Sequence, residues 1–186
     1  MKDIILASAS PRRKELLSYL NLPFTIYPSP FEETFSPSDD PCTVVTKLAK
    51  GKAVEVAKQF PQSIVIGSDT IVAGSKILGK PKNEEEAVSM LKELSGSTHS
   101  VWTAVSIISP ERIKTFAEQV EVTFWPLSEE EIQAYVKTSD PYDKAGGYGI
   151  QSGGSLFVKQ IVGDYYAVMG LPISRLNREL RDFLPD

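Results

Sequence analysis

Blocks of apolar and polar positions alternate along this chain and predict strands and helices in turn. Short continuous apolar runs are typical of buried strands, whereas apolar residues at spacings of three and four are typical of helices that cover a sheet. In the first part of the chain the pattern predicts a strand at Ile4–Ala7, a helix that begins at Ser10–Pro11, a strand and a proline-punctuated loop within Leu22–Phe35, a helix at Pro41–Phe60, and a strand at Ser63–Gly74 that breaks at Gly67–Thr70 before it resumes.

The second half continues the alternation. Asn83 and Glu86 have the spacing of a capping box, and so have Ser128 and Glu131, so both pairs predict helix starts. The expected elements are a helix at Lys82–Gly96, an antiparallel hairpin of Val101–Ser109 with Lys114–Leu127, a helix from Ser128 to about Thr138, a glycine-rich loop at Lys144–Gly154, one or two strands within Ser155–Pro172, and an amphipathic helix at Ile173–Leu184. Alternating strands and helices indicate an α/β fold.

Composition adds bounds on this picture. The chain has 186 residues, of which 41% are hydrophobic, enough for a core, and we expect a single domain over residues 1–186. A net charge of −4 argues against a nonspecific nucleic-acid coat, and we expect no nucleic-acid partner. The sequence shows no membrane-spanning run and no signal peptide, so we expect no membrane partner and a cytoplasmic location. Cys42 and His99 are the single members of their residue types, so a metal ion would need oxygen ligands.

Two arginines, Arg12 and Arg13, lie in the predicted first turn of a helix. That end of a helix already carries partial positive charge and free N–H groups, so cations there are locally unfavourable. A phosphate would reverse the sign, because N–H groups, serine hydroxyls and guanidinium groups could all donate to it. The alternative is that both side chains turn into solvent.

Carboxylates stand at two positions that suit chemistry. Asp69 follows an apolar run and Gly67, so we expect it at or just past the end of a core strand, where ligands bind in open α/β sheets. It could serve as a metal ligand or general base, or be an ordinary turn residue. The acidic pair Glu32–Glu33 closes a predicted loop.

Loop and helix cations supply a second group of candidates. Lys80 lies between a glycine and a proline and could deliver a charge to a phosphate, although loop lysines also serve solubility. Lys52 is one of four lysines in a predicted helix, and helical phase does not single it out.

The segment from Lys144 to Gln151 holds three glycines together with Tyr148 and Gln151. Glycines allow close approach of a ligand, an aromatic ring can pack near a base or sugar, and an amide can pair with a nucleobase edge, yet such segments are often only turns. For His99 we expect a capping or core hydrogen bond rather than a ligand role. Together, paired cations, carboxylates and this segment suit metal-assisted hydrolysis of a nucleotide phosphate.

Six motifs occur in order over nearly the whole chain: "ASASPRRKELL", "GSDT", "GKP", "SGSTHSVWTAV", "DKAGGYGIQ" and "GDYYAVMGLP". In this order and spacing the sequence closely resembles the Maf family of nucleotide pyrophosphatases. The resemblance implies an elongated, two-lobed mixed-sheet fold related to inosine triphosphate pyrophosphatases, with a central cleft. It also implies hydrolysis of a nucleoside triphosphate to the monophosphate and pyrophosphate, dependent on a divalent cation, Mg2+ or Mn2+, as a house-cleaning step.

Carried onto this sequence, the resemblance implies roles for individual residues. Asp69 would be the catalytic proton acceptor and, with Glu33, a metal ligand. The implied phosphate-binding residues are Ser8, Arg13, Lys52 and Lys80.

Subfamily markers point to pyrimidine substrates. The branch that acts on dTTP and UTP carries the residues found here as Arg12, Thr70 and Gln151, whereas the branch acting on 7-methyl-GTP differs at all three. Two alternatives stay open, a nucleotide sensor connected with septum formation and a phosphatase that releases orthophosphate. A homodimer is implied only by the resemblance.

Overall fold

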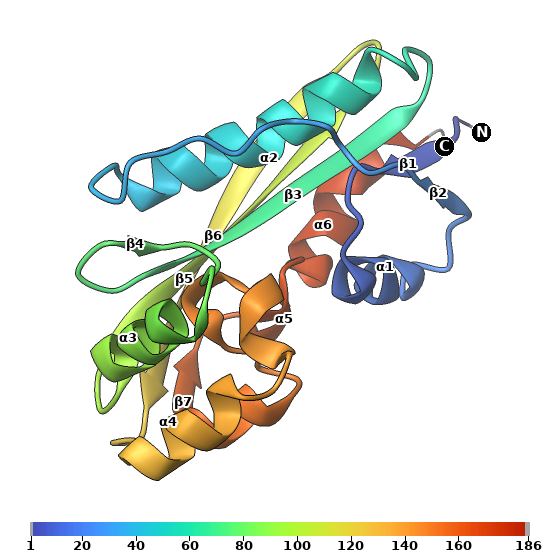
Figure 1. Ribbon diagram of the computed structural model, residues 1–186. Helices are drawn as coiled ribbons and strands as arrows, with labels where there is room; N and C mark the ends of the chain where they lie inside the picture. Colours follow the sequence, from blue (N-terminus) through green and yellow to red (C-terminus); the bar gives the residue numbers. More distant parts are fainter. Residues whose placement is uncertain (1, 185–186) are drawn as a thin grey trace.

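The computed structural model describes residues 2–184, which form a mixed seven-stranded sheet with helices on both faces (Figure 1). The strands are β1 (Ile4–Leu6), β2 (Phe24–Ile26), β3 (Ile64–Ala73), β4 (Ile77–Leu78), β5 (Thr98–Ile108), β6 (Ile113–Phe124) and β7 (Val158–Val162). Their order is β2-β1-β3-β5-β6-β7, with β4 paired to β3. The pairs β1/β2 and β1/β3 are parallel, and the others are antiparallel. The predicted α/β class and the β5/β6 hairpin are confirmed.

Six α-helices surround the described part of this sheet: α1 (Pro11–Ser18), α2 (Pro41–Ala57), α3 (Glu84–Leu94), α4 (Glu129–Val136), α5 (Tyr165–Met169) and α6 (Ile173–Leu180). Short 3-10 helices occur at Asp140–Asp143 (η1), Ala145–Gly147 (η2), Gly153–Phe157 (η3) and Arg181–Phe183 (η4). In Figure 1, α2 runs along one face of the long strands, α1 and α6 lie at one end of the sheet, and α3 and α4 lie at the other. The elongated arrangement with two ends agrees with the predicted two lobes.

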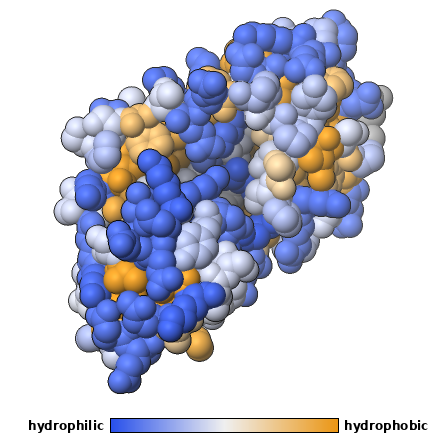
Figure 2. Space-filling model, viewed as in Figure 1, coloured by the Kyte–Doolittle hydropathy of each residue, from blue (hydrophilic) through white to orange (hydrophobic). Residues whose placement is uncertain are grey.

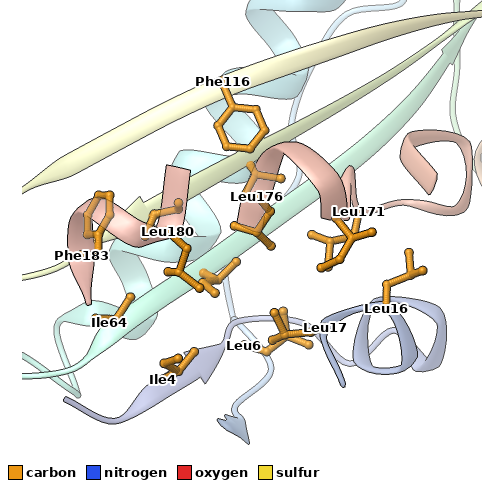
Figure 3. Close-up of a cluster of buried hydrophobic side chains, with 14 of the residues drawn as sticks. Ile4, Leu6, Leu16, Leu17, Ile64, Phe116, Leu171, Leu176, Leu180 and Phe183 are labelled. Atoms are coloured by element: carbon orange, nitrogen blue, oxygen red, sulfur yellow. The ribbon is translucent and has the colours of Figure 1, made fainter. Parts of the chain in front are cut away.

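Separate apolar clusters stabilise the two ends. Buried side chains of β1, α1, β3 and α6 meet in one cluster, shown in Figure 3 with Leu16, Leu171 and Leu176 among its members. A second cluster at the other end joins α3 and α4 to β6 and includes Leu91, Phe124 and other buried side chains. Burial of each such side chain is worth roughly 1.5–3 kcal/mol, so each lobe has its own source of stability.

One sequence prediction on the strands is wrong: the strand predicted to break at Gly67–Thr70 is the continuous β3, because β5 pairs with it from Val65 to Ala73. Within Ser155–Pro172, where one or two strands were predicted, the structure has the single strand β7, and Tyr165–Met169 is the helix α5, which the sequence did not predict. The Asp164 carboxylate caps α5 by accepting from the Tyr166 N–H, and Gly170 ends it at φ 113°, so local caps override the β-propensity of the tyrosines and valine.

Predicted helix ends also shift. α2 stops at Ala57 rather than Phe60, and α6 stops at Leu180 and continues as η4 to Phe183. Asn83 caps α3 as expected, but the Glu86 carboxylate accepts from the Lys82 N–H, so that capping box is only half formed. The capping box of Ser128 with Glu131 is complete.

The edge of β3 is open in its middle, and this opening locates the site. On the edge opposite β5, β1 pairs with Ile64–Ile66 and β4 pairs with Val72 and Ala73, so among the described residues Gly67–Ile71 have no strand on that side. Asp69 therefore lies inside a strand and not past its end. It does lie just beyond the point where the parallel neighbour β1 stops, which is where ligands reach such sheets.

Gly67 lets helix α2 approach β3 more closely than any side chain would allow. A Cβ atom at Gly67 would lie 2.6 Å from the Ala49 carbonyl oxygen and 2.7 Å from the Ala53 nitrogen. Both are backbone atoms of α2 and cannot move aside without moving the helix. The contact fixes the height of Lys52, which lies between these two alanines in the sequence, above the open edge of β3.

Candidate active site

A cleft of about 330 Å³ lies where the two lobes meet, and Figure 2 shows the surface hollowed near the middle of this face. Most predicted site residues line it: Arg12, Arg13, Glu33, Lys52, Asp69, Thr70, Lys80 and Gln151. Ser8 does not line it, although Ser10 does. We call Arg13, Glu33, Lys52, Asp69 and Lys80 the ionic wall, and residues 140–152 the loop wall.

The Asp69 carboxylate is buried and held from several directions. Its Oδ2 accepts a hydrogen bond from Lys52 Nζ at 2.8 Å, and its Oδ1 accepts from the Thr70 backbone N–H at 2.7 Å. The guanidinium of Arg13 adds an ion pair at 3.9 Å. These contacts fix the orientation of the carboxylate, which lines the cleft.

Lys52 joins the two carboxylates of the ionic wall. Its Nζ also donates to Glu33 Oε1 at 2.6 Å, so a single ammonium group bridges Glu33 and Asp69. The loop that carries Glu33 is seated on α2 through Phe31, whose ring lies so close to Gly51 that a Cβ there would be 2.4 Å from it. Glu33, and not Glu32, is thereby brought to Lys52.

The charges around Glu33 keep it ionised. Partial burial by itself would raise the pKa of Glu33, but the hydrogen bond and charge of Lys52, with the charges of Lys80 and Arg13, hold its pKa below the usual value. Glu33 is therefore a carboxylate at neutral pH, available as an oxygen ligand.

Arg13 turns inward from the first turn of α1. Its Nε donates to the Gly170 carbonyl at 2.9 Å, and its two terminal nitrogens donate to Ser8 Oγ at 3.2 Å and Thr70 Oγ1 at 3.3 Å. Burial lowers the pKa of Arg13, while the nearby Asp69 charge opposes that shift. Protein acceptors thus compensate this cation, and Ser8, predicted to bind phosphate, contacts Arg13 from outside the cleft lining.

The other cleft cations differ in how they are paired. Lys144 Nζ donates to the Asp140 carbonyl, Asp140 Oδ1 and Asp143 Oδ1, so all three of its protons are used. Arg12 contacts Asp143 at 3.4 Å and is only partly buried. Within residues 2–184, Lys80 makes no side-chain hydrogen bond or ion pair, so its charge is the least committed in the cleft.

The three predicted specificity residues lie in different settings. Thr70 Oγ1 contacts Arg13 and shares a 2.9 Å hydrogen bond with Thr103, so it is tied to the ionic wall. Gln151 is exposed on the loop wall, and Arg12 reaches that wall through Asp143.

Tyr148 lines the cleft, as expected, although most of its side chain is buried. Only 5% of it is exposed, and its hydroxyl is 2.8 Å from Nε2 of the buried His99. Desolvation lowers the pKa of His99 to about 4, so it is neutral at physiological pH. The predicted core hydrogen bond of His99 is confirmed.

Several contributors were missed in the sequence. The Gly170 carbonyl accepts from both Arg13 and Ser68, and Thr103 donates to the Ala167 carbonyl at 2.7 Å, so hydroxyls of β3 and β5 anchor α5. Ser68 and Thr103 are polar residues inside apolar strands, and this pattern could have marked them as functional in the sequence. No comparable pattern marked Asp140, the partner of Lys144.

The carboxylates present fit a divalent cation with few protein ligands. Within residues 2–184 no group of three or more His, Cys, Asp or Glu side chains could hold a metal ion. Glu33 and Asp69 lie within hydrogen-bond reach of the same Nζ and supply two carboxylates. Mg2+ is commonly held by one or two carboxylates together with substrate phosphates and water, so this donor set suits it.

The chain is similar to proteins of known name and to a solved structure. A "dTTP/UTP pyrophosphatase" of Bacillus cereus (strain G9842) is 57% identical over 184 residues, covering 98% of this chain and 96% of the relative. One of Bacillus mycoides (strain KBAB4) with the same name is 56% identical over 187 residues, covering 100% of this chain and 98% of the relative. The solved structure of a HAM1 protein from Coxiella burnetii aligns with 98% of this chain and 100% of its own at a TM-score of 0.59 and 15% identity, which shows a shared fold. The model of the family described as Maf-like protein matches residues 3–183, and the chain belongs to this family.

Proposed function

We propose that this protein is a nucleoside triphosphate pyrophosphatase that converts dTTP and UTP to the monophosphate and pyrophosphate. The observation that carries the proposal is the position of the Asp69 carboxylate. Lys52 and the Thr70 N–H hold it at the open edge of β3, in the same cleft as the ammonium group of Lys80. The two Bacillus relatives, named for this activity and matched over almost the whole chain, support the same reaction.

In the proposed reaction Asp69 accepts a proton from a water molecule, whose oxygen attacks the α-phosphorus. The bond between that phosphorus and the bridging oxygen breaks, and pyrophosphate leaves with the electron pair. Lys80 and Arg13 would stabilise negative charge on the phosphates, and Lys52 would hold the Asp69 carboxylate in its orientation. Glu33 and Asp69 would hold Mg2+ or Mn2+, which when bound supplies charge neutralisation on phosphate oxygens.

Substrate choice is assigned to the loop wall together with Arg12 and Thr70. An amide such as Gln151 offers one donor and one acceptor, which matches the 4-oxo and 3-NH edge of thymine or uracil. The cellular role that we propose is to prevent the incorporation of non-standard nucleotides. We further propose that the protein forms a homodimer and acts in the cytoplasm. Each described helix is too short or too polar to cross a membrane.

The test is product analysis with purified protein and Mg2+ or Mn2+ over dTTP, UTP, CTP, 7-methyl-GTP, ITP and common purine nucleotides. We expect monophosphate plus pyrophosphate, fastest from dTTP or UTP, and no turnover when the metal is chelated. In water enriched with 18O the label should enter the monophosphate, because attack is at the α-phosphorus. Orthophosphate as the first product indicates the phosphatase alternative, and tight binding without turnover indicates a sensor.

A further inference from the structure

The Asp140 carboxylate, at the start of η1, organises the loop wall without lining the cleft itself. Its Oδ2 accepts hydrogen bonds from Tyr135 Oη at 2.5 Å and Ser152 Oγ at 2.6 Å, and its Oδ1 accepts from Lys144 Nζ at 2.9 Å. The Asp140 backbone carbonyl accepts a further bond from Lys144 at 2.8 Å. One side chain thus gathers donors from α4 and from both ends of the glycine-rich segment.

These partners fix the segment at three points. Lys144 is its first residue, Ser152 follows Gln151 directly, and the Gly149 N–H donates to Tyr135 Oη at 3.1 Å. Gln151 therefore lies between two anchored positions, Gly149 and Ser152, and both anchors lead to Asp140.

The segment is folded tightly around these anchors. A Cβ atom at Gly149 would lie 2.1 Å from Ser152 Oγ and 2.7 Å from Lys144 Cε, and one at Gly154 would lie 2.7 Å from the Gly149 nitrogen. The absence of side chains at these glycines lets Lys144 and Ser152 pack directly against the backbone of the segment. Because Gln151 directly precedes Ser152, we expect a change in the partners of Asp140 to displace Gln151.

Protonation states agree with this arrangement. Burial alone would raise the pKa of Asp140, but the bonds from Ser152, Tyr135 and Lys144 keep its pKa below the usual value. Desolvation raises the pKa of Tyr135, so its phenol keeps the proton that it donates to Asp140. Lys144 spends its three protons on this network and is not free for a phosphate.

We propose that Asp140 is a positioning residue for substrate selectivity: by holding Lys144, Ser152 and, through Tyr135, Gly149, it fixes the Gln151 amide where it meets the base of the nucleotide. The proposal rests on the proposed function, because it concerns the base recognised in the same cleft. It predicts that loss of the carboxylate affects the choice among nucleotides more than the rate of the chemical step.

Asp140→Asn tests the proposal, with Asp3→Asn, an exposed carboxyl outside the cleft lining, as the matched control. We expect kcat/KM for dTTP to fall about tenfold and that for 7-methyl-GTP to stay near its original value, while kcat for dTTP changes little, since a hydrogen bond to a charged group is worth about this factor or more. Ser152→Ala, which removes only the anchor beside Gln151, should lower selectivity in the same direction if Asp140→Asn fails to fold.

A double variant separates positioning from general damage. In a Gln151→Ala background, Asp140→Asn should cause no further loss of the dTTP to 7-methyl-GTP ratio, because the group it positions is already absent. An unchanged ratio in Asp140→Asn, or an equal loss for all nucleotides in both backgrounds, would overturn the proposal.

The proposed function fails in a different way. If wild-type protein binds dTTP without releasing pyrophosphate, the proposed reaction is wrong. The role of Asp140 is then tested by the ratio of the dissociation constants for dTTP and 7-methyl-GTP, measured calorimetrically in the wild-type protein and in Asp140→Asn. If wild-type protein binds neither nucleotide, both proposals are overturned.

Discussion

The two walls of the cleft are assembled in opposite ways. The ionic wall collects single residues from five separate places in the chain, and the packing of α1, α2 and β3 sets their distances. The loop wall is one continuous segment, residues 140–152, in which Asp140 accepts hydrogen bonds from Lys144 and Ser152 of the segment and from Tyr135 of α4. Damage to the ionic wall should therefore abolish chemistry or disturb helix packing, whereas damage to the loop wall should alter which ligand is accepted.

The largest effect is expected at the centre of the ionic wall. Asp69→Asn keeps the shape of the side chain but removes the proton acceptor, so kcat should fall by about 10²- to 10⁴-fold. Pyrophosphate release from dTTP measures the effect. Glu121→Gln, on the exposed face of β6, is the matched control. A folded Asp69→Asn protein that turns over at the wild-type rate contradicts the assignment.

A variant of Lys80 tests whether a cation without a protein partner among the described side chains binds the substrate rather than stabilising the fold. Lys80→Gln should reduce kcat/KM for dTTP by about 10- to 100-fold, the worth of a hydrogen bond to a charged group. Thermal denaturation should show an unchanged midpoint, because Lys80 contacts no described side chain by a hydrogen bond or ion pair. Lys76→Gln, at an exposed turn, controls for the loss of one positive charge. Equal activities of the two variants would contradict a role for Lys80 in binding the substrate.

Gly67→Ala would test the dependence of the ionic wall on helix packing. The added methyl group would lie 2.6 and 2.7 Å from backbone atoms of α2, so we expect a loss of roughly 1–3 kcal/mol in the free energy of unfolding, together with slower turnover as Lys52 is displaced from Asp69. Urea denaturation measures the first effect. Gly79→Ala is the control, because its nearest neighbour, Phe35 Cζ, is 4.0 Å away. No difference in stability between these variants would show that α2 can adjust.

The smallest effect concerns the core behind the loop wall. Because burial holds the pKa of His99 at about 4, below the unfolded value of 6.5, the unfolded chain takes up the proton first. Stability is complete above pH 6.5 and falls as the pH drops toward 4, by about 1–2 kcal/mol near pH 5. Urea titrations near pH 7 and near pH 5 measure this fall, which His99→Gln should reduce. An equally steep fall in the variant would assign the dependence to carboxylates.

Local signals in the sequence predicted much of the fold and marked Arg13, Asp69 and Lys80 as candidates, whereas Lys52 and Glu33 were singled out only by the family resemblance. The hairpin of β5 and β6 and the helix starts at Asn83 and Ser128 depend on nearby residues, and they appear as expected. The motif containing Asp69 was placed at the cleft. Its strand was nevertheless predicted to break, because Gly67 and Asp69 are turn formers by propensity. Their roles are non-local: the glycine admits α2, and the carboxylate meets Lys52.

The loop wall was harder to predict for the same physical reason. Glycines in Lys144–Gly154 signalled a close-packed turn, but nothing local distinguishes Asp140 from other acidic residues that follow a helix. Its importance arises only when Tyr135, Lys144 and Ser152 converge on it in three dimensions. Likewise, the hydrogen bond of Tyr148 to His99 could not be predicted, because the two residues are distant in the sequence.

The convergence of several donors on the Asp140 carboxylate has a consequence for how such a protein can change. Because Tyr135, Lys144 and Ser152 all donate to Asp140, we expect these four residues to change as a unit when the ligand preference changes, with Arg12 and Thr70 changing separately. The ionic wall offers no such unit, since its members are scattered and each depends on the packing of another element. In this architecture we therefore expect the ligand preference to change more readily than the reaction.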